Sequence, residues 1–407
     1  MKVRSITCFI DPSFPLDEQK LVSAGEFIRI ARPAYEQAGY EVQSTRLATI
    51  PFPLILDGHK PSLLTQFARQ LEGAAAGADY SYVSLGPAFP DQLEWYTSIP
   101  EALAATQNAF FSGSLTTQEG KVSLAAVRQC AQIIQRASSI SADGFGNLRF
   151  AALANVPAGS PFFPAAYHQG GAPTFALATE AADLAVIAFS QSGSLEEARE
   201  RLATSIEAHA LALTSIAKQV EKLSRVIFGG IDFSLASFPS QELSMGTAME
   251  RLGVPKLGEH GSLAAAAILA DTIDQADFKR AGFSGLMLPV LEDATLARRA
   301  EEGILEVKDL LLYSCVCGTG LDCIPLPGDT SNESMAAILL DLACLSSRLE
   351  KPLTARLMPI PGKSVGDQTG FDFAYFANSR VLPISASPLE ASLAGDESFS
   401  LRKRGPR

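Results

Sequence analysis

The sequence has few charged residues and no excess of positive charge. Only 19% of its 407 residues are charged, and 44 acidic residues outnumber 33 basic ones, which gives a net charge of −11. A nucleic-acid-binding protein needs a basic surface that displaces counterions from the phosphates, so we expect no nucleic-acid partner. Because 47% of the residues are hydrophobic, the composition excludes a disordered chain and indicates a globular protein with a large core.

Cysteines and long apolar runs are also scarce. Six cysteines in a chain of this length do not resemble a secreted disulfide framework. The apolar stretch at the N-terminus ends at Asp11, which makes it too short for a signal peptide. The longest uncharged apolar run, 263–270, is far below the roughly 20 residues that span a bilayer. We therefore expect a cytoplasmic protein with no membrane partner.

Short runs rich in β-branched and aromatic residues alternate with longer segments of helical periodicity. This alternation is typical of β–α units and a largely parallel sheet. The strand candidates are 3–10, 40–48, 80–85, 108–112, 149–155, 174–178, 226–233, 285–289, 321–326 and 354–360. Ten strands are more than an ordinary doubly wound sheet contains. We expect a single ten-stranded α/β barrel over residues 1–385, followed by a flexible tail, 386–407.

Two helices carry sequence signals for their first residues. Apolar residues recur every three or four positions over 195–223, which predicts an amphipathic helix. Ser194 and Glu197 predict a capping box at its start. Thr330 and Glu333 predict a second capping box, at the start of a helix over 331–348.

Several signatures of cofactor or hydrolase families are incomplete in this chain. The segment 144–149 has arginine where the dinucleotide-binding fingerprint needs its third glycine. Leu357 stands where a phosphate-binding P-loop would begin with glycine. The cysteines at 315, 317 and 323 lack the paired spacing and the nearby histidine of a zinc site. No resident metal is therefore predicted from a motif.

Polar residues follow several predicted strands, at the ends where parallel α/β folds bind ligands. Asn155 opens a proline- and aromatic-rich loop that ends in His168, one of only four histidines. Asp232 lies near the end of the strand 226–233. These positions predict a site with an acid/base group.

Two later strand ends have the composition of an anion site. Gly328, Asp329 and Thr330 precede a helix, where free amides and the helix dipole favour an anion. Lys363 and Asp367 follow the strand 354–360 and bring a lysine and an acid together.

Each candidate also has a structural interpretation. Asp329 can cap the following helix, and His168 can be a buried histidine with satisfied hydrogen bonds. Lys363 can be an exposed loop charge. Cys317 can be a small buried residue, although the glycines beside it would leave a thiolate accessible.

Five segments of the chain resemble one protein family. They are GFGNLRF (144–150), SPFFPAAYH (160–168), IDFSLA (231–236), CGTGLDCIPLPGDT (317–330) and RLMPIPGKSVGD (356–367). In this order they resemble the family catalogued as domain of unknown function 711, which is related to the uncharacterised protein family 0210. The resemblance extends from Val3 to Phe373.

The resemblance implies a fold similar to that of the glycyl radical enzymes, such as pyruvate formate-lyase, whose ten-stranded α/β barrel has two five-stranded halves. Radical chemistry is not implied. Those enzymes keep their radical glycine in an Arg-Val-x-Gly-Tyr segment, whereas Arg380-Val381 continues here as Leu382-Pro383-Ile384.

We expect an enzyme that acts on a small anionic metabolite at the barrel centre by acid/base or thiol chemistry. The catalytic candidates are His168 as acid/base, Cys317 as nucleophile, and Asp232 or Asp322 as orienting carboxylates. The candidates for binding the substrate are Gly328, Asp329, Thr330, Lys363, Asp367, Asn155 and Arg149.

Two alternatives use the same pocket. In one, a divalent metal held by His168, Asp232, Asp322 or Asp367 serves a hydrolase or lyase. In the other, the protein is a non-catalytic sensor of a small ligand. The number of titratable groups favours an enzyme, and a homo-oligomer is compatible with either reading.

Overall fold

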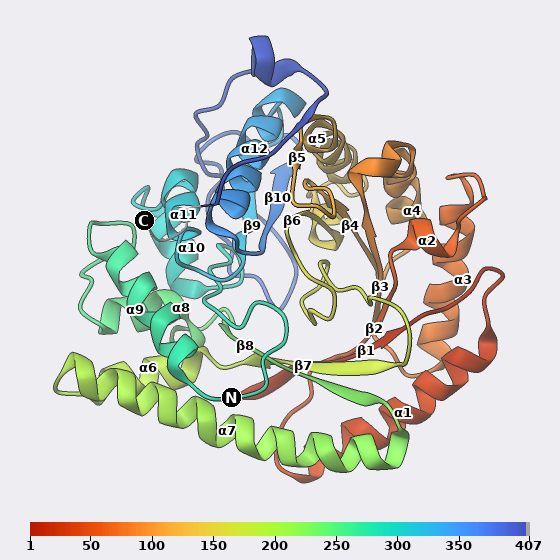
Figure 1. The fold of residues 1–407 in the computed structure, drawn as a ribbon. Coiled ribbons are helices and arrows are strands. Elements are labelled where there is room, and N and C mark those ends of the chain that lie inside the picture. The colour runs from red at the N-terminus through yellow and green to blue at the C-terminus, as the bar shows by residue number, and fades with distance from the viewer. Residues whose placement is uncertain (404–407) are drawn as a thin grey trace.

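Nine strands form one mixed sheet in the computed structural model of the protein, which describes residues 1–403 (Figure 1). Their order across the sheet is β8-β7-β1-β2-β3-β4-β6-β10-β9. The strands are β1 Lys2–Ile10, β2 Thr45–Thr49, β3 Tyr82–Ala88, β4 Ala109–Ser114, β6 Phe150–Ala154, β7 Thr174–Glu180, β8 Ile227–Ala236, β9 Gly320–Pro327 and β10 Leu353–Ile360. The mixed α/β class that the alternating pattern predicts is confirmed.

The direction of the strands reverses twice across the sheet. β1, β2, β3, β4 and β6 run parallel to one another. β7 pairs antiparallel with β1, and β10 pairs antiparallel with β6. β8 then runs parallel to β7, and β9 runs parallel to β10. The carboxyl ends of the first five strands therefore lie at one end of the sheet, and those of the other four lie at the opposite end.

The predicted strand 285–289 is wrong, whereas the other nine predicted strands are all present with shifted ends. No continuous ladder of backbone pairs forms over 285–289, and the chain just before it is irregular, with φ values of +61° at Gly282 and +39° at Ser284. The longer segment 280–289 makes single bridges, from Arg280 to Ile231 of β8 and from Pro289 to Asp322 of β9. It therefore contacts both edge strands, and closure of the sheet into a ten-stranded barrel stays a prediction.

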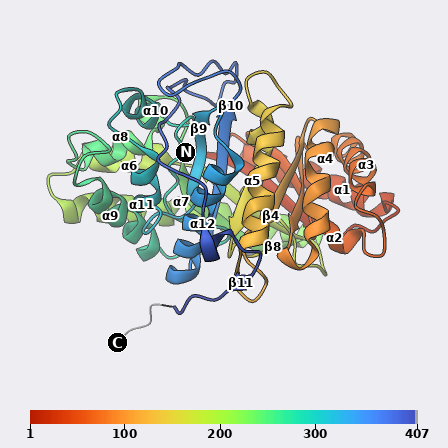
Figure 2. The ribbon, with the colours of Figure 1, turned by 90° about the horizontal axis from the view of Figure 1, so that it is seen from above.

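Helices lie on the outer side of the curved sheet (Figures 1 and 2). They are α1 Glu18–Gln37, α2 Phe52–Ile55, α3 Leu63–Gly77, α4 Ile99–Ala105, α5 Leu124–Ser138, α6 Ala182–Ser190, α7 Leu195–Ser224, α8 Met245–Arg251, α9 Ser262–Gln275, α10 Ala294–Glu301, α11 Val307–Tyr313 and α12 Asn332–Leu349. Within residues 1–403, none of them is long and apolar enough to cross a membrane.

The helix starts are close to those predicted, but their caps differ in detail. The Ser194 side chain accepts a hydrogen bond from the Glu197 N–H, as expected, while the Glu197 carboxylate accepts from the Gly193 N–H instead of completing the box. The predicted cap at Thr330 is wrong. Ser331 caps α12, and the Thr330 hydroxyl donates to the Pro327 carbonyl at 2.7 Å.

The segment predicted as a tail contains one short strand. β11 (Ser398–Phe399) pairs antiparallel with β5 (Val122–Ser123), at the start of α5. Residues 404–407, the end of the predicted tail, lie outside the described part of the chain.

Gly320 starts β9 in a conformation that other residues adopt only with strain. Its φ is +100°, and an added Cβ would lie 2.4 Å from the Thr354 carbonyl oxygen. We expect Gly320→Ala to lower the free energy of unfolding by about 2 kcal/mol or more. Gly73, inside α3 with open space around it, is the matched control, and Gly73→Ala should raise stability by about 0.5–1 kcal/mol. Urea denaturation of both variants measures the difference, and equal effects would contradict the strain at Gly320.

Candidate functional site

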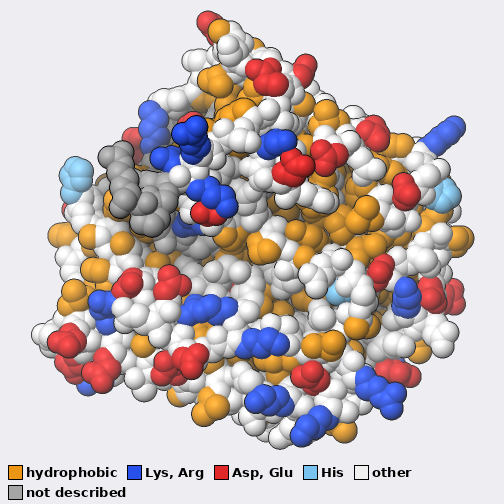
Figure 3. Space-filling view, viewed as in Figure 1, with side chains coloured by type: hydrophobic (Ala, Val, Ile, Leu, Met, Phe, Trp, Pro, Cys, Tyr) orange, Lys and Arg blue, Asp and Glu red, His pale blue; other side chains and the backbone are white. Residues whose placement is uncertain are grey.

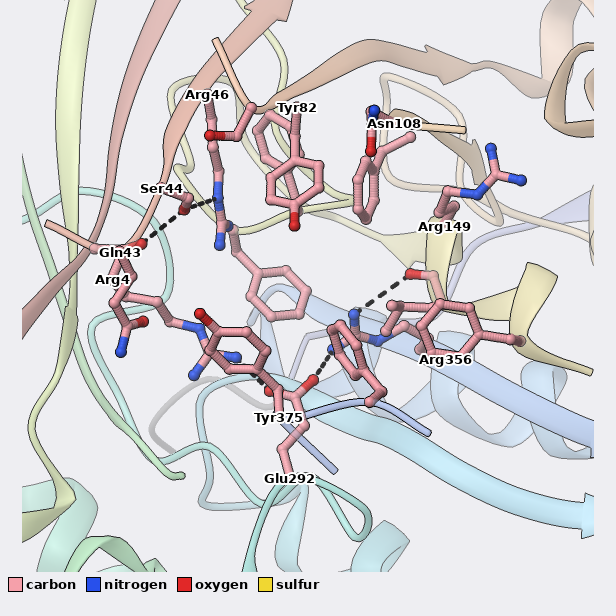
Figure 4. Close-up of a pocket in the computed structure, with 18 of the residues that line it drawn as sticks. Arg4, Gln43, Ser44, Arg46, Tyr82, Asn108, Arg149, Glu292, Arg356 and Tyr375 are labelled. Carbon is pink, nitrogen blue, oxygen red and sulfur yellow. Dashed lines mark hydrogen bonds and ion pairs between the residues drawn. The ribbon is translucent and has the colours of Figure 1, made fainter. Parts of the chain in front are cut away.

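A cavity of about 560 Å³ lies at the amino ends of the first five strands and the carboxyl ends of β7 and β8 (Figure 4). A volume of this size is typical of sites for small metabolites. Its polar lining includes Arg4, Gln43, Ser44, Arg46, Tyr82, Asn108, Arg149, Asp232, Ser234, Glu292, Arg356 and Tyr375. The reversal of strand direction explains this position, because it places opposite strand ends of the two parts of the sheet around one space.

Glu292 is the central carboxylate of the cavity wall. It accepts hydrogen bonds from the guanidinium groups of Arg4 and Arg356, the latter at 3.0 Å. Arg356 also donates from Nε to Asp322 at 2.6 Å. Burial alone would raise the pKa of Glu292, but the positive charges of Arg4 and Arg356 hold it below its usual range. Glu292 is therefore an ionised link between β1 and β10.

Asp322 lies directly behind Arg356, outside the lining of the cavity. Burial raises the pKa of its carboxyl group against the opposing charge of Arg356. Its Oδ2 is buried without a hydrogen-bond partner in the described chain. Asp322, a predicted catalytic residue, therefore does not line the cavity. It holds Arg356, which does.

Arg46 differs from Arg4 and Arg356 because no carboxylate pairs with it in the part of the chain that the structure describes. Its Nε donates to the Ser44 hydroxyl at 3.0 Å, and the guanidinium lies 5.2 Å from the centre of the Phe163 ring. Burial lowers its pKa, and the charge of Arg4 acts in the same direction. Figure 4 shows its guanidinium facing the open space. The Nη groups of Arg46 are therefore available to an anionic ligand.

Arg149, a predicted substrate-binding residue, lines the cavity but directs its charge away from it (Figure 4). Its guanidinium donates to the backbone carbonyls of Leu103 at 2.8 Å, Thr106 at 2.9 Å and Ala109 at 3.3 Å. These contacts fix the chain around α4, so a structural role accounts for Arg149.

Asp232 on β8 also lines the cavity, as a buried carboxyl group. It accepts hydrogen bonds from the backbone N–H groups of Phe283 and Ser284, each at 3.0 Å, and from the Ser234 hydroxyl. Burial raises its pKa, although these hydrogen bonds oppose the shift. The close approach requires Gly282, where an added Cβ would lie 2.1 Å from Oδ2.

Three further predicted residues do not line the cavity. His168 is buried at the opposite end of the first five strands, where its N–H donates to the Thr49 carbonyl at 2.9 Å. Asn155, at the same end, donates to the Ser346 hydroxyl at 2.9 Å. Cys317 is buried, and its carbonyl accepts a hydrogen bond from the Lys351 ammonium group. Of His168, Asp232 and Cys317, only Asp232 faces the cavity.

The predicted anion site after β9 and β10 is a contact between two loops. The Gly328 N–H donates to the Lys363 carbonyl at 3.0 Å, so the two loops do lie together. The Asp367 carboxylate accepts from the Ser364 N–H at 2.7 Å, and Thr330 bonds within its own turn. Asp329 is exposed. None of these residues is part of the cavity lining.

The residues that the sequence reasoning missed are Arg4, Arg46, Glu292 and Arg356. Three of them are arginines inside strands that are otherwise largely apolar, in the segments KVRSITCFI, TRLAT and LTARLMPI. A charged side chain in a buried strand must be paired or must serve a site. Such a charge within an apolar segment can be seen in the sequence, although it does not lie at a strand end.

A group of possible metal ligands lies beside the cavity. Single ligand atoms of Glu292, Asp322 and Cys323 lie within 4.8 Å of one another. However, the two carboxylates are already bonded to Arg356, and Glu292 also to Arg4. A dication there would be repelled by two guanidinium charges, so the group fits an ion-pair network better than a metal. The other predicted metal ligands do not form a group either, because His168 and Asp367 lie outside the cavity that Asp232 lines.

The protein is thus a mixed α/β protein. Its cavity is lined by arginines and lies between two sets of strands that run in opposite directions. The chain belongs to the family described as "Uncharacterised ACR (DUF711)", whose model matches residues 1–378. The family that the five motifs predict is thereby confirmed.

Proteins of several other organisms are similar to this chain over most of its length. The chain is 29% identical over 369 residues to a "UPF0210 protein" of Acetivibrio thermocellus, covering 86% of this chain and 80% of that protein. It is 28% identical over 411 residues to one of Pelotomaculum thermopropionicum, covering 94% and 91%. It is 29% identical over 391 residues to one of Methanosarcina acetivorans, covering 90% and 83%.

The buried pairing of Glu292 predicts a large effect of its removal. Glu292→Gln leaves Arg4 and Arg356 without their shared counter-charge, so we expect a loss of about 3 kcal/mol in the free energy of unfolding. Glu41 pairs with Lys2 on the surface, and Glu41→Gln should change stability by less than about 0.5 kcal/mol. Guanidinium chloride would screen these pairs, so the measurement is urea denaturation at low salt. Equal effects of both substitutions would contradict the role of Glu292.

Proposed function

We propose that the protein is an enzyme that binds a small anionic metabolite in the cavity and acts on it by acid/base chemistry. The observation that carries the proposal is Arg46, a cation that faces the cavity and has no carboxylate partner among the described residues. A charged guanidinium held there by Ser44 and Phe163 offers its two Nη groups to a carboxylate or phosphate. Hydrogen bonds of this kind contribute about 1.5–3 kcal/mol each.

Asp232 is the group that we propose for proton transfer. It lines the same cavity, and burial moves its pKa upward, toward neutral pH. A general acid or base works best when its pKa is near the working pH. Glu292 is less suited, because Arg4 and Arg356 stabilise its ionised form. In this assignment Glu292 positions the arginines, and Asp232 exchanges the proton.

Thiol chemistry receives less support than acid/base chemistry. Cys317 lies outside the cavity lining. Cys323 is fully buried, and burial raises its pKa well above the usual value, which disfavours the nucleophilic thiolate. Two expectations from the sequence stay predictions. They are the cytoplasmic location and a fold like that of the glycyl radical enzymes.

One observation favours a non-catalytic ligand sensor as the second candidate. The Asp232 carboxylate already accepts hydrogen bonds from Ser234, Phe283 and Ser284. These bonds suit a purely structural role, in which case the cavity would bind an anion without changing it. Incubation with a metabolite extract, followed by NMR of the extract, distinguishes the two candidates, because only an enzyme converts a bound compound.

Arg46→Gln tests the binding site. We expect the affinity of wild-type protein for its best ligand among benzoate, succinate and inorganic phosphate to fall about tenfold or more in this variant, because two charge-assisted hydrogen bonds are lost. Isothermal titration calorimetry measures the affinities. Arg32, an exposed arginine of α1 paired with Glu36, is the matched control, and Arg32→Gln should bind as wild type does. Unchanged affinity in Arg46→Gln would refute Arg46 as the anion ligand.

The raised pKa of Asp232 predicts how anion binding depends on pH. Its carboxyl group is neutral below that pKa and becomes a negative charge in the cavity as the pH rises through it. Anion affinity should therefore fall with rising pH above the ordinary carboxyl range. In Asp232→Asn this part of the pH dependence should disappear. Calorimetric titrations of benzoate between pH 4.5 and pH 8 compare the two proteins, and parallel curves would contradict the assignment.

A further inference from the structure

The cavity has an aromatic wall beside its free cation. Tyr82 on β3 and Phe110 on β4 lie edge to face, with ring centres 5.5 Å apart. Phe110 lies in the same manner against Phe163, at 5.4 Å. All three rings line the cavity. Because they come from neighbouring strands and from the loop after β6, they form one continuous surface.

Arg46 stands at the border of this aromatic wall. Its guanidinium carbon lies 5.2 Å from the centre of the Phe163 ring. An anion bound by the Nη groups would lie beside Phe163, so the rest of its molecule can pack against Phe163, Phe110 and Tyr82. Aromatic rings contact each other favourably in offset or edge-to-face geometry, and a flat ring has such partners here.

The charges of the cavity favour a single anionic group on the ligand. Arg4 and Arg356 are paired with Glu292, and Arg356 also with Asp322. Arg149 directs its donors to backbone carbonyls. A second carboxylate, or the two charges of a phosphate, would face these satisfied cations and the Asp232 carboxyl. Arg46 alone, among the arginines that line the cavity in the described chain, has both Nη groups uncommitted.

We infer that the cavity recognises an aromatic monocarboxylate, with its carboxylate on Arg46 and its ring against Tyr82, Phe110 and Phe163. This inference rests on the proposed function, because it uses the same anion site. It adds the class of the molecule, and it separates that class from dicarboxylates and from phosphorylated compounds.

Calorimetric titration of the wild-type protein with five probes tests the inference. The probes are 3-phenylpropionate, 3-cyclohexylpropionate, propionate, succinate and inorganic phosphate. We expect 3-phenylpropionate to bind at least about tenfold more tightly than propionate or succinate, which corresponds to about 1.4 kcal/mol. It should also bind more tightly than 3-cyclohexylpropionate, which buries a similar apolar area but has no flat ring.

Tyr82→Ala should weaken binding of 3-phenylpropionate about fivefold or more while leaving the melting temperature near that of the wild type, since Tyr82 is half-buried. Phe14 packs on Phe67 and His59 and is not part of the cavity lining. Phe14→Ala is therefore the matched control, with unchanged binding expected.

The outcomes separate the inference from the proposed function. Tighter binding of phosphate or succinate than of 3-phenylpropionate, with a loss in Arg46→Gln, overturns the aromatic class and keeps the anion site. Equal binding of the cyclohexyl and phenyl compounds overturns the role of the aromatic wall. Binding of no probe by the wild-type protein, or binding that Arg46→Gln leaves unchanged, overturns the anion site and the inference together. Because the comparison of probes uses wild-type protein, it holds even if Tyr82→Ala does not fold.

Discussion

The reversal of strand direction at the β1–β7 and β6–β10 pairs is the constraint on which the site depends. In a sheet of parallel strands, all carboxyl ends share one edge, and ligands bind there. Here the amino ends of β1, β2 and β3 face the carboxyl ends of β7 and β8. The cavity forms at this junction, and side chains from both kinds of strand end line it. Arg4 and Arg46 line the cavity because they lie early in their strands.

This constraint also explains how far the sequence alone could predict the fold. Alternating apolar and helical segments indicated nine of the nine main strands and the long helix α7, because burial and periodicity are local properties that the residues carry themselves. The order and direction of the strands depend on contacts between distant segments. No local pattern shows that β7 turns back along β1, or that 285–289 makes a single bridge to β9 in place of a strand.

The candidate site was less predictable for the same reason. His168 and Asn155 follow the carboxyl end of β6, which the reversal places at the end of the sheet opposite the cavity. Asp232 was found because β8 ends at the cavity. The arginines could have been found from a different signal, since Arg356 in LTARLMPI is a charge inside a buried strand. Arg46 and Arg4 carry the same signal in segments that contain more polar residues.

Net charge is a poor guide to the character of such a site. The chain carries a charge of −11, and acidic and basic side chains are interspersed on the face shown in Figure 3. Inside the cavity, four arginines line the wall together with few carboxylates. Salt screens the surface charges within about 10 Å, so these internal groups decide which ligand charge is favoured.

The segment 280–289 has a consequence for how the protein behaves in a crowded solution. An edge strand exposes a row of unpaired N–H and C=O groups that can template the addition of a strand from another molecule. The Ala281 N–H donates to the Ile231 carbonyl of β8, and the N–H of Val290, directly after the segment, donates to the Asp322 carbonyl of β9. One irregular segment thus covers part of both edges of the sheet. Because this segment makes isolated bridges and no continuous strand, it presents no regular row of unpaired backbone groups of its own, which disfavours edge-to-edge pairing with another molecule.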